Sequence, residues 1–265
     1  MTGISRFSLE EKTVAITGGT SRYGRQMVSD VASSGATVIT TSREIDAAEQ
    51  IAKQEQKKGH DVRAQQLDLA EHDSVVDFCD TIIDQYDNFH GLVNNAVARP
   101  MDHLYADMED WRESMECNAT GTLEITRRTA RHLAETGGGS IINVGSIYGM
   151  VGPSPHLYEG TELLSEHEYG PSPDYYYHKS GLINMSKYFA SLFGKDDVRV
   201  NCVSPGGIYS EELDEQFVEK YNQQTALDRM ATAEDLSGVI VFLLSDAAKY
   251  ITGTNIPVDG GFTAK

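Results

Sequence analysis

The sequence predicts a single-domain α/β protein built on a doubly wound parallel sheet with helices on both faces. Short apolar runs alternate with longer helical stretches along the whole chain, which is the pattern of a parallel sheet with helical crossovers. The first apolar run, residues 13–17 (TVAIT), is followed at once by glycines, as expected for a strand buried on both faces. The length of 265 residues and the hydrophobic content of 40% suit one domain, residues 1–265, with a large core.

The apolar and amphipathic segments define the elements of this sheet in chain order. After the strand at 13–17, extended runs are expected at 36–41, 62–67, 91–93, 140–144, 198–203 and 255–258. Helices are expected at 25–34, 45–58, 73–86, 111–134 and 175–193. The carboxyl ends of parallel strands share one edge of the sheet, so ligand-binding residues are expected there.

The charge and the cysteine content limit the possible partners. With 22 Lys and Arg against 40 Asp and Glu, the formal net charge is −18, which argues against nucleic acid or an anionic membrane as a partner. Cys79, Cys117 and Cys202 are odd in number and widely spaced, as expected of reduced thiols in a cytoplasmic protein. We find no secretory signal pattern and no apolar run of ~18 residues, so we expect no membrane-spanning helix.

A tyrosine and a lysine stand four residues apart, at Tyr175 and Lys179, inside the helix expected at 175–193. This spacing puts both side chains on one helix face, one turn apart. A phenol ordinarily titrates near pH ~10, and an adjacent ammonium lowers that pKa because it favours the phenolate. The pair could therefore act as general acid and base at a substrate oxygen, although the same spacing also suits a surface tyrosine and lysine.

Other spaced elements accompany this pair. They are T-G-x-x-x-x-x-G at 17–24, N-N-A at 94–96, Asn118, Ser146 and Pro205-Gly206. In this order, between Lys12 and Gly261, they resemble the short-chain dehydrogenase/reductases. The resemblance implies a Rossmann-like fold and an NAD(P)-dependent oxidoreductase that moves a hydride between the nicotinamide and a secondary alcohol or ketone.

The resemblance also implies a catalytic role for each of four residues. Ser146 would polarise the substrate oxygen, and Tyr175 would deliver or remove its proton. Lys179 would bind the nicotinamide ribose and hold down the pKa of Tyr175. Asn118 would hold a water in a proton relay behind the lysine.

Three neighbours of Tyr175 are rivals for its role. Tyr176 and Tyr177 have no lysine four residues later, so they are expected to be packing residues. His178 as the base is the weaker alternative.

The turn at 17–24 lies between the first strand and the first helix, where backbone N–H groups and the helix dipole favour a pyrophosphate. Arg22 stands where the family usually has the middle one of three glycines. Its guanidinium either contacts a phosphate or points into solvent. By resemblance, the cofactor contacts of this turn are Gly18, Ser21, Arg22 and Tyr23.

The end of the second strand favours NADP over NAD. Thr41, Ser42 and Arg43 stand there, and none is acidic; Glu44 follows one residue too late to accept the ribose 2′-hydroxyl of NAD. By resemblance, Ser42 and Arg43 suit a 2′-phosphate instead. Asp68 and Leu69 match the adenine contact of the family, and Asp68 could also cap the next helix.

The resemblance supplies the contacts of the nicotinamide half as well. These are Asn94, Ala96, Tyr175, Lys179, Pro205, Gly206, Ile208 and Ser210. Val97 stands where glycine is usual and restricts the backbone there. Residues at about 208–225 would form a mobile lid. Residues 258–261 resemble the segment through which many members associate, so a homo-oligomer, dimer or tetramer, is expected.

A long insertion, at about 152–173, separates Ser146 from Tyr175, which are 29 positions apart, more than the family usually has. It is rich in Pro, Gly, Glu, His and Tyr, and a long loop beside a catalytic pair is typically functional. The residues that could line a polar pocket for a sugar-like or polyol substrate are Tyr148, His156, Tyr158, Glu159 and His167. The alternative is a lid or an oligomer contact; a His and Glu metal site is rejected because its spacing is poor.

The stretches SIYG and YEGT are also similar to oxidoreductases of bacterial surface-sugar and flagellin-modification pathways. We therefore expect a cytoplasmic enzyme of carbohydrate metabolism with a small-molecule substrate. Two other functions stay open: a non-catalytic dinucleotide-sensing regulator, which would not need the Asn, Ser, Tyr and Lys, and a sugar-nucleotide epimerase or dehydratase, which usually carries a larger C-terminal region.

Overall fold

The computed structural model describes residues 4–86, 88–161 and 171–265. Within these ranges, seven parallel strands form one sheet in the order β3-β2-β1-β4-β5-β6-β7. The strands are β1 (Thr13–Ile16), β2 (Thr37–Ser42), β3 (Val62–Gln66), β4 (Phe89–Asn94), β5 (Gly139–Val144), β6 (Val198–Pro205) and β7 (Asn255–Val258). The doubly wound fold predicted from the sequence is confirmed.

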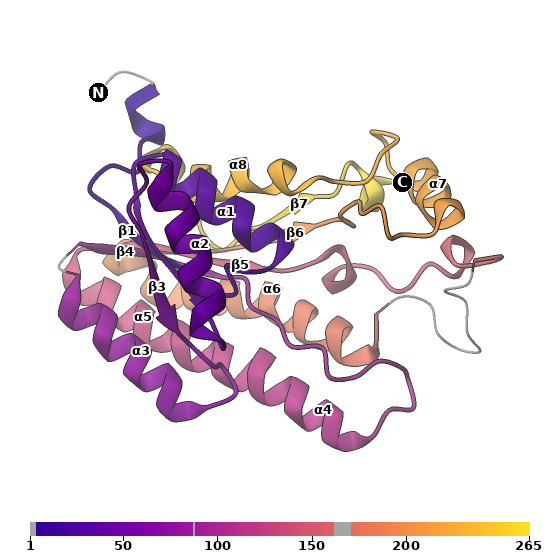
Figure 1. Cartoon of the computed structure of the whole chain (residues 1–265), viewed down its shortest axis with the longest axis horizontal. Helices are drawn as coiled ribbons and strands as arrows, with labels where there is room; N and C mark the ends of the chain where they lie inside the picture. Colours follow the sequence, from indigo (N-terminus) through magenta and orange to yellow (C-terminus); the bar gives the residue numbers. More distant parts are fainter. Residues whose placement is uncertain (1–3, 87, 162–170) are drawn as a thin grey trace.

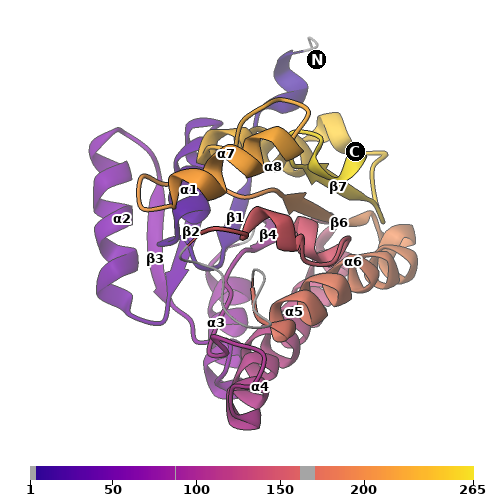
Figure 2. The ribbon, with the colours of Figure 1, turned by 90° about the vertical axis from the view of Figure 1, so that its right-hand side faces the viewer.

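Helices cover both faces of the sheet (Figures 1 and 2). The helices are α1 (Arg22–Ser33), α2 (Ile45–Lys57), α3 (His72–Gln85), α4 (Met108–Met115), α5 (Thr122–Thr136), α6 (Pro173–Phe193), α7 (Glu215–Gln224) and α8 (Ala233–Leu244). Apolar side chains of α1, α2 and α8 pack into one core cluster, and those of α3, α5 and α6 pack into another.

Successive residues of a strand face opposite sides, and this alternation divides the core in two. Val14 and Ile16 of β1 lie in the cluster of α1 and α8, whereas Ala15 lies in the cluster of α3, α5 and α6. All three side chains are buried. The sheet is therefore covered on both sides, as the continuously apolar run predicts.

The strand order reverses between β1 and β4, because the chain builds β2 and β3 on one side and then crosses to β4 on the other. Asn95 ties the two strand ends together, since its side-chain amide donates to the carbonyl oxygens of Thr17 and Gly18 at 2.9 Å each. The Thr17 hydroxyl accepts from the backbone N–H groups of Asn95 and Ala96 at 3.0 Å each. Such a reversal opens a crevice at the carboxyl ends of the strands, where α/β sheets bind ligands.

The structure divides one of the predicted helices into three parts. The long helix expected at 111–134 is α4, then a π-helical turn (Glu116–Gly121), then α5. The π turn lies against the segment after β3, so closely that a Cβ on Gly121 would lie 1.8 Å from the carbonyl oxygen of Leu69. This contact joins residues far apart in sequence, so the helical periodicity of 111–134 gave no sign of it.

A third cluster of buried side chains joins the first part of the insertion to α7 and to the C-terminal segment. Its members are Ile147, Leu157, Tyr158, Phe217, Tyr221, Met230 and Phe262. The ring centroid of Tyr158 lies 5.2 Å from that of Phe217 on α7, and the Phe217 centroid lies 5.9 Å from that of Tyr221. The insertion is thus attached to the predicted lid as far as residue 161; residues 162–170, with His167, lie outside the described residues.

In the described ranges, no helix has both the length and the apolar character needed to cross a membrane. Cys79, Cys117 and Cys202 are free and buried, which agrees with the predicted reduced thiols. Burial raises the pKa of the Cys202 thiol to about 11.

The contact at the π turn gives a stability prediction. Gly121→Ala should lower the free energy of unfolding by about 1–3 kcal/mol, because the added methyl group must displace the backbone of Leu69. Chemical denaturation measures this. The control is Gly238→Ala on α8, where a Cβ would meet no atom within 4 Å and where alanine should gain roughly 0.5–1 kcal/mol. Similar unfolding curves for the two variants would contradict the packing argument.

Candidate active site

Tyr175 and Lys179 lie one turn apart on α6, as the sequence predicts. The Lys179 ammonium is buried and donates a hydrogen bond of 2.6 Å to the carbonyl oxygen of Val144, at the end of β5. Its Nζ lies 5.5 Å from the centroid of the Tyr175 ring. Ser146 follows β5, is buried, and caps a short 3-10 turn by accepting from the N–H of Tyr148 at 3.2 Å. The structure therefore brings Ser146, Tyr175 and Lys179 together.

The surroundings of Tyr175 favour its phenolate. Burial acts to raise the pKa of this phenol, but the Lys179 ammonium, the Arg99 guanidinium and the Ser146 hydroxyl more than offset burial, and the pKa lies below the usual 10.0. The Lys179 pKa is itself lowered, mainly by burial. A tyrosine with a lowered pKa is suited to exchange a proton with a substrate oxygen near neutral pH.

The rival residues around Tyr175 have different surroundings. Burial raises the pKa of Tyr176, whose ring packs 4.9 Å from that of Tyr148. Tyr177 is 62% exposed and packs against Trp111. Burial and the nearby Lys179 lower the pKa of His178 to about 3, so this imidazole is neutral at pH 7 and a weak base.

Asn118 lies in the π turn and connects three segments around the site. Its Oδ1 accepts from the N–H of Ala98 at 2.9 Å, and its Nδ2 donates to the Ala98 carbonyl oxygen at 2.8 Å and to Ser114 Oγ at 3.0 Å. Both amide hydrogens thus bond to protein atoms, which leaves the side chain no donor for a water. The relay role of Asn118 stays a prediction.

Asp174 completes this network, and sequence reasoning missed it. The carboxylate is fully buried at the start of α6 and accepts from the hydroxyls of Ser114 and Ser172 at 2.5 Å each. Ser114 links Asp174 to Asn118, since its hydroxyl donates to Asp174 and accepts from the Asn118 amide. These bonds hold the start of α6, where Tyr175 directly follows Asp174. The available signal was an acidic residue in the first turn directly before Tyr175, which resembles an ordinary helix start.

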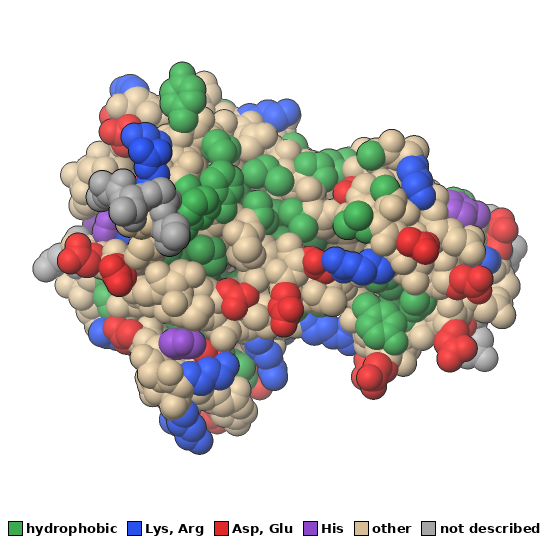
Figure 3. All heavy atoms as spheres, turned by 90° about the horizontal axis from the view of Figure 1, so that it is seen from above, with side chains coloured by type: hydrophobic (Ala, Val, Ile, Leu, Met, Phe, Trp, Pro, Cys, Tyr) green, Lys and Arg blue, Asp and Glu red, His purple; other side chains and the backbone are tan. Residues whose placement is uncertain are grey.

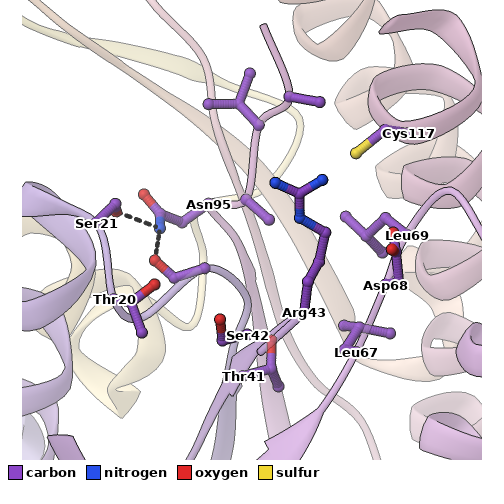
Figure 4. Close-up of a pocket in the computed structure, with 14 residues that line it drawn as sticks. Thr20, Ser21, Thr41, Ser42, Arg43, Leu67, Asp68, Leu69, Asn95 and Cys117 are labelled. Atoms are coloured by element: carbon purple, nitrogen blue, oxygen red, sulfur yellow. Dashed lines mark hydrogen bonds between the residues drawn. The ribbon is translucent and has the colours of Figure 1, made fainter. Parts of the chain in front are cut away.

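A cavity of about 270 Å³ opens where the strand order reverses (Figure 4). Its walls come from the phosphate turn, the end of β2, the segment after β3 and the segment after β4; the lining residues are Gly18, Thr20, Ser21, Thr41, Ser42, Arg43, Leu67, Asp68, Leu69, Asn95, Ala96, Val97, Ala98 and Cys117. Figure 4 shows the Arg43 side chain extending from the end of β2 into the cavity, towards Cys117. Most of the residues predicted to bind the adenosine end of the cofactor are therefore brought together here.

The turn that faces this cavity fits a dinucleotide. Gly18 has a φ of +63°, and a Cβ there would lie 2.8 Å from Cα of Ala96, so only glycine allows the two segments to approach. Ser21 caps α1, its Oγ accepting from the N–H of Gly24 at 3.1 Å, so α1 begins at Arg22, before the predicted start at residue 25. A helix N-terminus with free N–H groups favours phosphate.

Two predicted cofactor residues bond to other protein groups, and their cofactor contacts stay predictions. The half-exposed Arg22 guanidinium donates to Ser210 Oγ at 2.9 Å and to Glu212 at 3.3 Å. It therefore bridges the phosphate turn and the segment before α7. Asn94 is buried in the core, where its amide donates to Thr126 and Asn143; the residue that lines the cavity is Asn95, because neighbouring side chains of a strand end face opposite ways.

The remaining predicted cofactor residues lie around the same edge. The Asp68 carboxylate lines the cavity and accepts from the N–H of Ala70 at 3.0 Å. It does not cap α3, because the N-cap residue of that helix is Glu71 and no side chain caps it. The Tyr23 hydroxyl donates to the carbonyl oxygen of Gly206 at 3.2 Å, which holds α1 against the end of β6 next to Pro205. Ile208 forms a β-bridge with Ala231.

The residues predicted to line the substrate side divide into two pairs. The hydroxyls of Tyr148 and Tyr158 lie 3.4 Å apart, and the Tyr158 ring is buried in the cluster with α7. His156 and Glu159 are exposed, and the Glu159 carbonyl oxygen accepts from the Lys220 ammonium. In the part of the chain that the structure describes, no group of three or more His, Cys, Asp and Glu could hold a metal ion.

Arg99 is a further residue that the sequence did not single out. Its guanidinium carbon lies 4.4 Å from the centroid of the Tyr175 ring, over its face. Arg99 follows β4 by five residues, in a stretch with no helical or strand pattern. Only the tertiary structure shows that it reaches Tyr175.

Comparisons with known proteins agree with this geometry. A family model described as enoyl-(acyl carrier protein) reductase matches residues 21–263. The 3-oxoacyl-(acyl-carrier-protein) reductase FabG of Aquifex aeolicus is 32% identical over 261 residues, which is 96% of this chain and 98% of that protein. The 2-dehydro-3-deoxy-D-gluconate 5-dehydrogenase of Escherichia coli is 28% identical and covers 99% of both chains.

A solved structure extends the comparison to three dimensions. The gluconate 5-dehydrogenase of Burkholderia cenocepacia, in complex with NADP and tartrate, superposes with a TM-score of 0.85 at 25% identity, covering 98% of each chain.

The lowered pKa of Tyr175 predicts the effect of removing one hydroxyl. Tyr175→Phe should reduce turnover by roughly 10²–10⁴-fold, because the proton carrier is lost, while calorimetry should show nearly unchanged dinucleotide affinity. Tyr177→Phe is the matched control and should keep full activity, because Tyr177 is 62% exposed and packs on Trp111. An active Tyr175→Phe enzyme would refute the assignment.

Proposed function

Because the chain belongs to the short-chain dehydrogenase/reductase family and is an NAD(P)-dependent oxidoreductase, we propose that it uses NADP to interconvert a secondary alcohol and a ketone on a sugar-like or polyol substrate. The observation that carries this proposal is the grouping of Ser146, Lys179 and Arg99 around a Tyr175 phenol of lowered pKa. A non-catalytic sensor would have no need of it.

Each residue of this group has a defined task in the proposed reaction. Ser146 donates a hydrogen bond to the substrate oxygen, and Tyr175 gives that oxygen a proton during reduction or removes one during oxidation. Lys179 stabilises the phenolate of Tyr175 and keeps further N–H groups for a ribose. When bound, the nicotinamide supplies or accepts the hydride.

The oxidation needs the phenolate of Tyr175. The rate of alcohol oxidation should therefore rise with pH through the lowered pKa of Tyr175.

The choice of NADP is supported by the charge of the cavity. Arg43 and Ser42 line it at the end of β2, and no acidic residue lines it there. A 2′-phosphate would gain a charge-assisted hydrogen bond from Arg43, whereas the 2′-hydroxyl of NAD would find no carboxylate. The NADP in the related gluconate 5-dehydrogenase structure is consistent with this choice.

Two tyrosine hydroxyls near Tyr175 support the proposal of a hydroxylated substrate. The hydroxyls of Tyr148 and Tyr158 lie 3.4 Å apart, next to the ring of Tyr176, and each can donate or accept a hydrogen bond. Two related proteins act, by name, on sugar acids: the gluconate 5-dehydrogenase and the 2-dehydro-3-deoxy-D-gluconate 5-dehydrogenase.

A homo-oligomer, dimer or tetramer, is part of the proposal. Large apolar side chains are exposed on the outer faces of α5 and α6: Leu123, Tyr177, Tyr188 and Leu192. Figure 3 shows apolar side chains also gathered over the face that carries α8. Apolar surface of this kind is typical of an interface between subunits.

Cofactor choice can be tested at Arg43. Arg43→Ala should weaken NADP by about tenfold to a hundredfold, because a charge-assisted contact is lost, and should leave NAD affinity nearly unchanged. Fluorescence titration of both reduced cofactors measures this. Arg131→Ala, which removes the same charge from α5, should change neither affinity. Equal losses of NADP and NAD in Arg43→Ala would show that Arg43 does not read the 2′-phosphate.

The insertion can be tested at Tyr158. Tyr158→Phe should keep the melting temperature, because the ring still packs on Phe217, and should raise KM by up to about tenfold if the lost hydroxyl binds substrate. Tyr158→Ala should also lower the free energy of unfolding by about 3–5 kcal/mol, as for other buried aromatic rings. An unchanged KM in Tyr158→Phe with an altered assembly size would favour the oligomer-contact alternative.

A further inference from the structure

Arg99 is held in place beside the reacting group by the backbone that precedes it. Both backbone polar groups of Ala98 are bonded to the Asn118 side chain, at 2.8 and 2.9 Å. From this fixed point the guanidinium extends over the face of the Tyr175 ring, 4.4 Å from its centroid. A cation over an aromatic face at this distance is attracted by the ring, so the side chain is directed towards the site.

Within the described residues, the charge of Arg99 has no acidic counterpart. Arg99 forms no ion pair with any Asp or Glu in residues 4–86, 88–161 and 171–265, although the chain has 40 acidic residues against 22 basic ones. The buried carboxylate next to Tyr175 in the chain, Asp174, accepts from two serine hydroxyls. The charged groups that act on Tyr175 are Lys179 and Arg99, both cationic.

The two cations differ in what they can reach. Lys179 is buried and bonded to the sheet through Val144, so it acts on the phenol and on a ribose. Arg99 is exposed and bonds to the Tyr175 side chain, so solvent screens its effect on Tyr175. A guanidinium has five N–H donors, which leaves further donors for a ligand. A planar guanidinium with parallel N–H groups matches carboxylate and phosphate oxygens.

We infer that Arg99 binds an oxyanion of the substrate, so the sugar-like or polyol substrate is an acid: it carries a carboxylate or a phosphate ester close to the carbon that is oxidised or reduced. This inference rests on the proposed function and narrows its substrate class. The guanidinium fixes one end of the substrate while Ser146 and Tyr175 hold the reacting oxygen, so two points of attachment orient the carbon between them.

The test compares matched acidic and neutral compounds on the NADP-loaded protein. The pairs are D-gluconate with D-glucitol and D-glucose 6-phosphate with D-glucose, with affinity measured by calorimetry and turnover by absorbance of the reduced cofactor. The acidic member of at least one pair should bind about tenfold more tightly or more, and its advantage should shrink as salt is raised. The pair that shows the larger difference identifies the carboxylate or the phosphate.

Three variants assign the difference to Arg99. Arg99→Met should remove the affinity advantage of the acidic member and leave the affinity of the neutral member unchanged, whereas turnover of both should fall because Arg99 also lowers the pKa of Tyr175. Arg99→Lys should keep part of it, because the charge stays and the paired N–H groups are lost. Arg131→Met, which removes an exposed charge from α5, should leave the affinity advantage of the acidic member intact.

The outcomes separate this inference from the proposed function. Equal binding of both members of each pair by the wild-type protein would overturn the role of Arg99, and so would an equal loss for both members in Arg99→Met. Turnover of a neutral polyol by the wild-type protein at least as fast as that of its acidic partner would overturn the inference and leave the oxidoreductase intact. Absence of NADP binding by the wild-type protein would overturn the proposed function itself.

Discussion

The geometry of the site depends on one buried cation. Lys179 lies inside the protein, where an ammonium loses its hydration and therefore needs close partners. The carbonyl oxygen of Val144 accepts from it at 2.6 Å, and Tyr175 lies one helical turn away. Because this bond joins α6 to the end of β5, it also sets Tyr175 beside Ser146, the second residue after that strand. The position of Tyr175 beside Ser146 thus follows from the need to give one buried charge its partners.

The sequence predicted the fold and the catalytic pair because both are local patterns. The apolar run at 13–17 and the spacing of Tyr175 and Lys179 need no knowledge of distant residues, and both predicted structures are present. The π turn was not predictable, because it is associated with a close contact between Gly121 and Leu69, which lie far apart in the sequence. Arg99 was missed for the same reason, since nothing in its neighbourhood in the sequence marks a residue that lies over Tyr175.

Electrostatics explains how a chain of net charge −18 can bind an anionic cofactor. Long-range repulsion between exposed charges is screened within about 10 Å in ordinary salt, so the local charges decide. The described edge of the sheet presents Arg43 in the cavity, Lys179 under the reacting tyrosine and Arg99 over it. Among the acidic residues near this edge, Asp174 accepts from serine hydroxyls and Glu212 from Arg22, whereas Asp68 lines the cavity itself. The three cations lie close to the ligand sites and can outweigh the distant acidic charges there.

The cluster that joins Tyr158 to Phe217 and Tyr221 has a kinetic consequence. A segment that closes over a bound nucleotide normally moves alone, but here α7 would carry the first part of the insertion with it, since their rings are packed together. If α7 moved far enough to release the nucleotide, the first part of the insertion would then also move away from Tyr148. An enzyme built in this way would bind its nucleotide first and release it last, and the second compound would have no complete site until the first had arrived.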